Sequence, residues 1–298
     1  MTDVNVESRL QQLAGRLLSF VPESSAVDWQ RTPAAAWREH RLGALLVAAP
    51  ETPPIRLHDL NAVGRQQAAL VQNTEQFLAG LPANNALLWG SRGAGKSSLI
   101  HALLNEYFER GLRLVQVEKT ALRHLHEISA RVADEPYRFI LFCDDLSFAG
   151  EEDGYKVLKS ALEGTVAGAA GNCLVYATSN RRHLLPEYAT DNQRTEVRDG
   201  ELHESEAVEE KISLSDRFGL WLSFYPMKQA DYLETVQYWL QQLLSKYEST
   251  LDVPDLGSER DPVRIEALAW ARARGGRSGR AAHYFARHWV GSRLLDQR

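Results

Sequence analysis

The stretch that most constrains this chain is Gly90-Ser91-Arg92-Gly93-Ala94-Gly95-Lys96-Ser97-Ser98, which fits the pattern G-x-x-x-x-G-K-[ST] of a phosphate-binding loop. Its glycines let the backbone curl so that successive N–H groups point toward phosphate oxygens. Lys96 would reach the β- and γ-phosphates of a nucleotide, and the Ser97 hydroxyl would ligate Mg²⁺, a cation that prefers oxygen. We therefore expect all nine residues to bind the nucleotide phosphates.

The neighbouring sequence supports this interpretation. The apolar run Ala86 to Trp89 is typical of a buried strand, and Ser98 to Phe108 reads as a helix that ends near Gly111. A helix that begins at the loop adds its free N–H groups and the positive end of its dipole. The alternative is a chance glycine turn, which the order of strand, loop and helix disfavours.

Composition bounds the class of protein. With 298 residues, 44% hydrophobic content and a net charge of −5, the chain can form one large domain or two modest ones. The net negative charge does not indicate binding to nucleic acid or to an anionic membrane, but it is compatible with DNA binding through a local basic patch. No apolar run is long enough to span a bilayer and no signal peptide is evident, so we expect a cytoplasmic protein. Cys143 and Cys173 lie in apolar runs and are expected to be buried thiols.

Strand and helix signals alternate after the loop, which predicts a parallel sheet with helices on both faces. The expected strands are Leu112 to Val117, Arg138 to Asp145, Asn172 to Asn180 and Leu220 to Tyr225, and the expected helices between and before them are Arg65 to Leu78, Thr120 to Ala133 and Tyr155 to Val166.

The ends of the chain read differently from its centre. Apolar residues at helical spacing between Val6 and Leu18, and a second predicted helix from Ala34 to Val47, indicate a helical N-terminal extension over residues 1–56. An α/β domain would follow over residues 57–225, interrupted by an acidic insertion from Glu187 to Lys211. Residues 226–298 are expected to be helical, with helices at Asp231 to Tyr247, Pro262 to Arg274 and Arg280 to Leu294.

Two further polar positions follow buried strands. Asp144 and Asp145 end one strand and Asn180 ends the next, and the carboxyl ends of parallel strands face the ligand side of a sheet. Asp144 would hold the Mg²⁺ shell, Asp145 would orient the attacking water, and Asn180 would contact the water or the γ-phosphate. The alternatives are a solvated strand end for the two acids and a turn-forming role for Asn180.

The order of these motifs resembles that of the AAA+ ATPases over roughly residues 57 to 298. The chain is more narrowly similar to an uncharacterised bacterial family of predicted AAA+ ATPases, a domain of unknown function, through Leu81 to Asn85, Leu141 to Phe148 and Ala177 to His183. The resemblance implies a three-layer α/β P-loop NTPase domain with a parallel sheet of strand order 5-1-4-3-2 and a C-terminal helical lid. It implies ATP and Mg²⁺ as cofactors.

By position, the resemblance gives Asp145 the role of catalytic acid, Asn180 that of sensor 1 and Arg280 that of sensor 2. Arg217, in Ser215-Asp216-Arg217-Phe218-Gly219, would be an arginine finger that completes a neighbouring subunit's site, which implies self-association. Asp145 stands where most members carry Glu, a shorter arm that could slow water activation. Glu118 to His124 shows no pore-loop motif, which argues against an unfoldase.

The sequence therefore predicts Mg²⁺-dependent ATP binding and hydrolysis, coupled to remodelling or loading of a macromolecular client that it does not name. Two alternatives stay open: a non-catalytic module gated by ATP, and a DNA-associated loader or initiator-like ATPase. A GTPase is disfavoured, since no Asn-Lys-x-Asp motif follows the loop. For the arginines near the C-terminus we favour one nucleotide contact plus solvated charge over a nucleic-acid patch; they are Arg272, Arg274, Arg277, Arg280 and Arg287.

Overall fold

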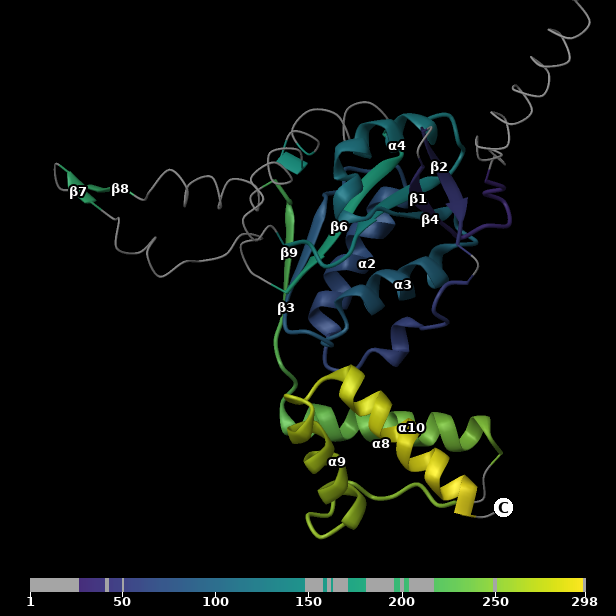
Figure 1. The fold of residues 1–298 in the computed structure, drawn as a ribbon, viewed down its shortest axis with the longest axis vertical. Helices are drawn as coiled ribbons and strands as arrows, with labels where there is room; N and C mark the ends of the chain where they lie inside the picture. The colour runs from purple at the N-terminus through teal and green to yellow at the C-terminus, as the bar shows by residue number, and fades with distance from the viewer. Residues whose placement is uncertain are drawn as a thin grey trace, which may run out of the picture.

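A computed structural model describes residues 27–40, 43–49, 51–147, 158–159, 162, 171–180, 196–198, 201–203, 217–248 and 251–296. A seven-stranded sheet lies at its centre, in the order β2-β1-β4-β5-β6-β3-β9 (Figure 1). Every neighbouring pair is parallel except β1 and β2. The strands are β1 (Ala34–His40), β2 (Gly43–Ala48), β3 (Ala86–Gly90), β4 (Leu112–Gln116), β5 (Arg138–Cys143), β6 (Cys173–Ser179) and β9 (Leu220–Phe224).

The five strands from β9 to β4 confirm the expected order 5-1-4-3-2 when β3 is counted as the first. Successive side chains of the central strands enter opposite cores, as the two-residue period of a strand requires. In β5, Leu141 joins the core on one face while Phe142 joins the core on the other. A strand buried on both faces has no polar side, which explains the continuous apolar runs in the sequence.

Helices cover both faces of this sheet and so produce the three layers. Helices α2 (Gly64–Leu78) and α3 (Lys96–Tyr107) contribute Leu70 and Leu99 to one core. The opposite face is covered by the short 3-10 helix η2 (Lys119–His124) and by α4 (Leu125–Arg131). The predicted helix from Tyr155 to Val166 falls mostly outside the described residues.

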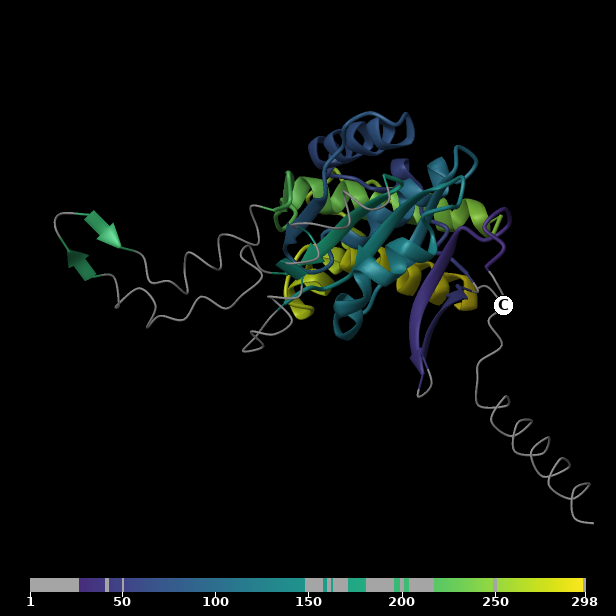
Figure 2. The ribbon, with the colours of Figure 1, turned by 90° about the horizontal axis from the view of Figure 1, so that it is seen from above.

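The predicted helix from Ala34 to Val47 is wrong, because this segment forms the strands β1 and β2. β1 pairs parallel with β4, β2 pairs antiparallel with β1, and Figure 2 shows both strands, in purple, at one edge of the sheet. Alanine and leucine are among the best helix formers, but that preference amounts to less than about 1 kcal/mol per residue, and pairing within the sheet outweighs it. Trp37, 1% exposed, packs into a core of the sheet domain, so residues 34–48 extend the sheet and do not form a helical extension. The segment from Val6 to Leu18 lies outside the described residues.

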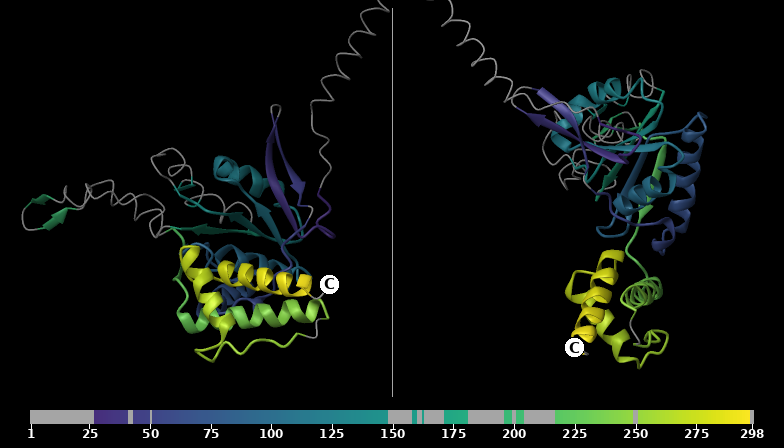
Figure 3. Two further views of the ribbon diagram at one scale, coloured as in Figure 1. Left: turned by 60° about the horizontal axis from the view of Figure 1, so that its bottom comes forward. Right: turned by 90° about the vertical axis from the view of Figure 1, so that its right-hand side faces the viewer.

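The predicted helical C-terminal segment is confirmed, with three helices around a core of their own. They are α8 (Gln229–Lys246), α9 (Pro262–Ala273) and α10 (Gly279–Asp296), and they lie together at one end of the molecule (Figures 1 and 3). Asp261 caps α9 by accepting hydrogen bonds from the N–H groups of Val263 and Arg264. We call these three helices the lid.

Within the expected acidic insertion, β7 (Glu196–Arg198) and β8 (Glu201–His203) form an antiparallel pair, and the rest of the insertion lies outside the described residues. In the part of the chain that the structure describes, no helix has the length and apolar character needed to cross a membrane.

Candidate nucleotide-binding site

The glycine loop connects β3 to α3 at the carboxyl end of the central strand. Gly90, Gly93 and Gly95 have φ angles of 125°, 72° and 98°, a region that side-chain-bearing residues rarely adopt. A Cβ at Gly90 would lie 2.0 Å from the carbonyl oxygen of Phe224, which also accepts a 2.8 Å hydrogen bond from Ser91 N. The loop therefore has its predicted backbone shape, and β9 holds it from one side.

Lys96 begins α3 and turns back into the loop. Its Nζ donates to the carbonyl oxygens of Gly90 at 2.8 Å and Ser91 at 2.9 Å, and to Oδ1 of Asn180 at 3.1 Å. Burial lowers the pKa of Lys96, and the nearby carboxylates of Asp145 and Asp144 oppose that shift. A buried ammonium whose acceptors are neutral carbonyl oxygens can exchange them for phosphate oxygens, which carry negative charge.

Asp144 lies at the end of β5 and joins three donors through one oxygen. Its Oδ1 accepts hydrogen bonds from Ser97 Oγ at 2.7 Å, from Thr178 Oγ1 at 2.5 Å and from the backbone N–H of Asp145 at 3.1 Å. Among the described residues, no hydrogen bond reaches its second oxygen. The two predicted magnesium ligands, Ser97 and Asp144, are therefore in direct contact, and their oxygens point toward each other.

Asp145 and Asn180 also touch, and Asn180 links two predicted site residues. Nδ2 of Asn180 donates to Oδ1 of Asp145, while its Oδ1 accepts from Lys96. Because an ammonium only donates and a carboxylate only accepts, these partners fix which end of the amide is oxygen. Asp145 has φ 52°, a left-handed conformation that Asp adopts more readily than most side-chain-bearing residues and that recurs at active sites.

The lid reaches the glycine loop through the first turn of α10. A Cβ at Gly93 would lie 3.0 Å from Ser278 Oγ and 3.2 Å from Arg280 Cβ. The backbone N–H of Arg280 donates to the Gly93 carbonyl at 3.4 Å, and the charge of Arg280 contributes to lowering the pKa of Lys96. The structure thus brings the predicted sensor 2 residue beside the phosphate loop.

A segment before α2 lies against the same loop. Leu60 Cδ2 lies 4.0 Å from the position of a Cβ on Gly95, and Nδ2 of Asn61 is buried with no hydrogen-bond partner among the described residues. Helix α3 holds the preceding stretch, since Nδ2 of Asn105 donates to the carbonyl oxygens of Pro53 and Ile55 at 2.8 and 2.7 Å. This segment also reaches the lid, because the Tyr238 hydroxyl donates to Asp59.

Arg217 does not join this cluster in its own subunit. It is exposed and lies just before β9, whose first residue, Leu220, bonds to Asn85 at the beginning of β3. β9 runs parallel to β3, so Arg217 lies at the opposite end of the sheet from the glycine loop. Of the predicted site residues, the structure gathers all except this one.

Sequence reasoning did not identify Thr178 and Asn61. Thr178 is 1% exposed; it donates to Asp144 and accepts the backbone N–H of Asp145 at 2.9 Å, so it positions both acids. Its signal was available, because Thr178 lies two residues before Asn180 and a strand turns alternate residues to the same face. Asn61 had no comparable signal.

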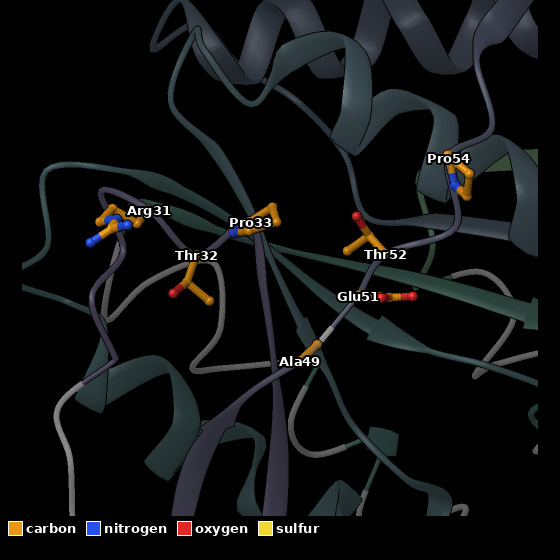
Figure 4. A pocket seen from close by; sticks show the side chains of 7 residues that line it. All are labelled: Arg31, Thr32, Pro33, Ala49, Glu51, Thr52 and Pro54. Carbon is orange, nitrogen blue, oxygen red and sulfur yellow. The ribbon is translucent and has the colours of Figure 1, made fainter.

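A separate hollow lies where β1 begins and β2 ends, bordered by Arg31, Pro33, Ala49 and Glu51 (Figure 4). None of the predicted site residues lines it. The hollow is therefore not part of the nucleotide site.

Comparisons with solved structures find the same fold in distant proteins. One mutant of Thermotoga maritima RuvB matches with a TM-score of 0.51 and 14% identity, over 82% of this chain and 67% of that one. A second mutant of the same protein matches with a TM-score of 0.52 and 15% identity, over 83% and 68%. The Aeropyrum pernix ORC1 protein in complex with DNA matches with a TM-score of 0.50 and 15% identity, over 79% of this chain and 61% of that one.

A search of curated proteins finds no match. Matches at such low sequence identity support a shared fold and no shared activity. The shared fold is that of the AAA+ P-loop ATPases. A family model described as "Protein of unknown function (DUF815)" matches residues 30–293. The chain therefore belongs to the DUF815 family and has the AAA+ P-loop ATPase fold.

Proposed function

We propose that this chain binds ATP with Mg²⁺ at the glycine loop and hydrolyses it. The observation that carries the proposal is the amide of Asn180, which contacts both Lys96 and Asp145. This amide links Lys96, whose charge would bind the β- and γ-phosphates, to Asp145, whose carboxylate would orient the attacking water. Catalysis of phosphoryl transfer rests mainly on such positioning and on electrostatic stabilisation.

The residues present fit a magnesium ion. Ser97 and Asp144 offer hydroxyl and carboxylate oxygens, the hard donors that Mg²⁺ prefers, and they stand 2.7 Å apart. When bound, the ion would neutralise charge that develops on the phosphate oxygens. Thr178 would keep Asp144 turned toward Ser97, and Lys96 would bind the phosphates as a second positive charge.

The remaining residues have proposed roles in the same reaction. Asp145 accepts a proton from water or orients it, and Arg280 responds to the γ-phosphate from the lid. Arg217 acts in a neighbouring copy of the chain, which agrees with its place far from its own loop and requires self-association. The movement of the lid is then coupled to remodelling or loading of a macromolecular client.

A non-catalytic module gated by ATP is the second candidate. The hydrogen bond from Asn180 engages one oxygen of Asp145, and the carboxylate arm is one methylene shorter than that of glutamate. If that bond persists when nucleotide binds, Asp145 would hold Asn180 in place without activating water. A DNA-associated ATPase is a third candidate, supported by the fold shared with ORC1, whose structure was solved in complex with DNA.

Phosphate release over many turnovers tests the proposal. We expect the full chain to release phosphate from ATP only with Mg²⁺, and an Asp145→Asn variant to bind ATP but release almost none. Glu118→Gln, which changes an acid that pairs with Arg38 of β1, serves as a matched control. Normal ATP binding with no release above the Lys96→Ala background would instead establish the non-catalytic module.

A further inference from the structure

The end of the chain carries an unbalanced positive charge. Residues 262–296 contain seven arginines, no lysine and two acids, Glu266 and Asp296, so their net charge is +5 in a chain of −5. Six of these arginines are exposed, and in the described ranges none of the six forms an ion pair with a carboxylate. They are Arg272, Arg274, Arg277, Arg280, Arg287 and Arg293.

Part of this charge forms a line on α10. Arg280, Tyr284 and Arg287 are spaced four and three residues apart, which places them on one face of a helix, and all three are exposed. The opposite face of α10 packs into the lid core through Ala286 and Trp289. The exposed face therefore presents arginine and aromatic side chains with no acid among them.

Trp270 of α9 and Arg274, which directly follows α9, lie beside this line. Trp270 stacks on His288 of α10 with ring centroids 4.9 Å apart, and the guanidinium carbon of Arg274 lies 3.2 Å from the centre of the Trp270 ring. A stacked guanidinium has its plane fixed while the N–H groups on its rim stay available to phosphate. We call Arg280, Tyr284, Arg287 and His288 of α10, with Trp270 of α9 and Arg274 directly after α9, the arginine stripe.

We propose that the arginine stripe binds single-stranded nucleic acid. Arg274 and Arg287 would contact backbone phosphates, and Tyr284, 48% exposed, would offer its ring to an unpaired base. Positive charge interleaved with exposed aromatic rings is the combination by which proteins hold single strands. An acidic protein surface would use the charge, but only a single strand offers phosphates and unpaired bases in alternation to match the arginines and the ring, so we favour nucleic acid.

The arginine stripe begins next to the proposed nucleotide site. Its first residue, Arg280, bonds to Gly93 of the glycine loop through its backbone N–H. Nucleic acid and ATP would therefore bind at adjoining parts of the lid. The proposal names a class of client for the suggested ATPase, but binding itself does not require hydrolysis, so the two can fail separately.

Fluorescence anisotropy with a labelled oligothymidylate of about 16 nucleotides tests the stripe in the full chain without nucleotide. We expect binding that weakens steeply with salt. Arg274→Ala and Arg287→Ala should each weaken it several-fold and lower the salt slope by about 0.7, the value for one phosphate contact on a single strand. Tyr284→Ala should weaken it about fivefold or more, and Tyr284→Phe should retain it.

Arg293→Ala is the matched control. It removes the same charge from the same helix, but Arg293 lies six residues from Arg287, on a different face, where it approaches the Trp289 ring at 5.5 Å. Binding and salt slope should stay at the parent values. Thermal unfolding of each variant shows whether it is folded, and Arg287→Glu on the exposed face decides the matter if Arg274→Ala unfolds.

Four results would overturn the proposal. They are no salt-dependent binding by the parent chain, equal weakening by Arg293→Ala, equal affinity for a duplex with no effect of Tyr284→Ala, and competition by polyglutamate as effective as by unlabelled oligonucleotide. The last would assign the stripe to an acidic protein. Loss of ATP hydrolysis alone would not bear on this site, since the measurement contains no ATP.

Discussion

Ser97 and Asp144, 47 positions apart in the chain, are joined by a hydrogen bond of 2.7 Å from the serine hydroxyl to Oδ1 of the carboxylate. The same oxygen accepts a hydrogen bond from Thr178, so three strand and helix ends meet at one atom. This arrangement sets the direction of the carboxylate before any ligand arrives. Preorganised ligands lower the cost of binding a small, strongly hydrated ion.

Replacing Thr178 with Val should misplace both acids. The change keeps the shape of a buried side chain but removes the 2.9 Å acceptor of the Asp145 backbone N–H and one of the three donors to Asp144. We expect a loss of about 1–3 kcal/mol in the free energy of unfolding, and a higher Mg²⁺ concentration for half-maximal ATP binding. Thr178→Ser retains the hydroxyl and should behave like the parent. Equal Mg²⁺ dependence in the Val and Ser variants would show that Thr178 does not position the ligand.

Lys96→Ala should weaken ATP binding sharply while the fold survives. In the proposed complex the ammonium would contact the β- and γ-phosphates, and this charged contact would be lost while the backbone cradle of the loop remains. Calorimetric titration with ATP measures the loss, and Lys246→Ala, an exposed lysine at the end of α8, controls for the change in charge. Parent affinity in a folded Lys96→Ala protein would remove the basis for the nucleotide site.

Gly90→Ala tests the contact between the glycine loop and β9. The new Cβ would lie 2.0 Å from the Phe224 carbonyl oxygen and would hold a φ of 125°, so the strands must separate or the loop must change shape. We expect destabilisation of about 3 kcal/mol or more in urea unfolding. Gly291→Ala on α10 meets nothing within 4 Å and should stabilise by about 0.5–1 kcal/mol. A Gly90→Ala protein as stable as the parent would refute the close approach.

Much of this fold could be predicted from the sequence because its central strands are unambiguous. The continuous apolar run from Phe139 to Cys143 is typical of a strand that is buried on both faces. The glycine loop marks the residue at which the first strand ends. The segment from Ala34 was misread because it is rich in good helix formers, and only pairing with β4 reveals it as a strand. That pairing joins residues about 80 positions apart and leaves no local pattern.

The site residues, too, differ in how far the sequence predicts them. Asp144, Asp145 and Asn180 follow strand ends and could be expected near the loop, whereas the amide that bridges Lys96 and Asp145 is a property of the assembled sheet. Leu60 and Asn61 precede α2, and Leu60 approaches the loop in a segment whose preceding stretch is anchored by Asn105. Such long-range contacts have no signature in a single sequence.

Tyr238→Phe tests the link between the lid and the segment before α2. Burial, and next the hydrogen bond to Asp59, raise the pKa of the Tyr238 hydroxyl, so it stays protonated and donates at neutral pH. Removing the hydroxyl should loosen the lid, weaken ATP binding several-fold and speed proteolysis between β9 and α8. Tyr247→Phe, 59% exposed at the end of the same helix, should change neither. Identical proteolysis of the two variants would contradict a role for this bond.

Arg217 gives the sharpest test of assembly. Because it lies at the far end of the sheet from its own glycine loop, any role in hydrolysis must be played in another copy. Fingers supplied by a partner contribute on the order of 10³-fold or more in rate, whereas a surface ion pair contributes little to stability. Arg217→Ala should therefore bind ATP normally and lose most of its turnover, with Arg65→Ala on α2 as the control for charge.

Mixing variants separates a trans role from a local one. Lys96→Ala subunits retain Arg217, and Arg217→Ala subunits retain the residues proposed to bind ATP, so a mixture should recover activity that neither variant has alone. Activity per subunit of the parent chain should also rise with protein concentration as copies associate. If specific activity stays constant across concentrations that span assembly, and the mixture recovers nothing, each subunit acts alone and Arg217 is not a finger.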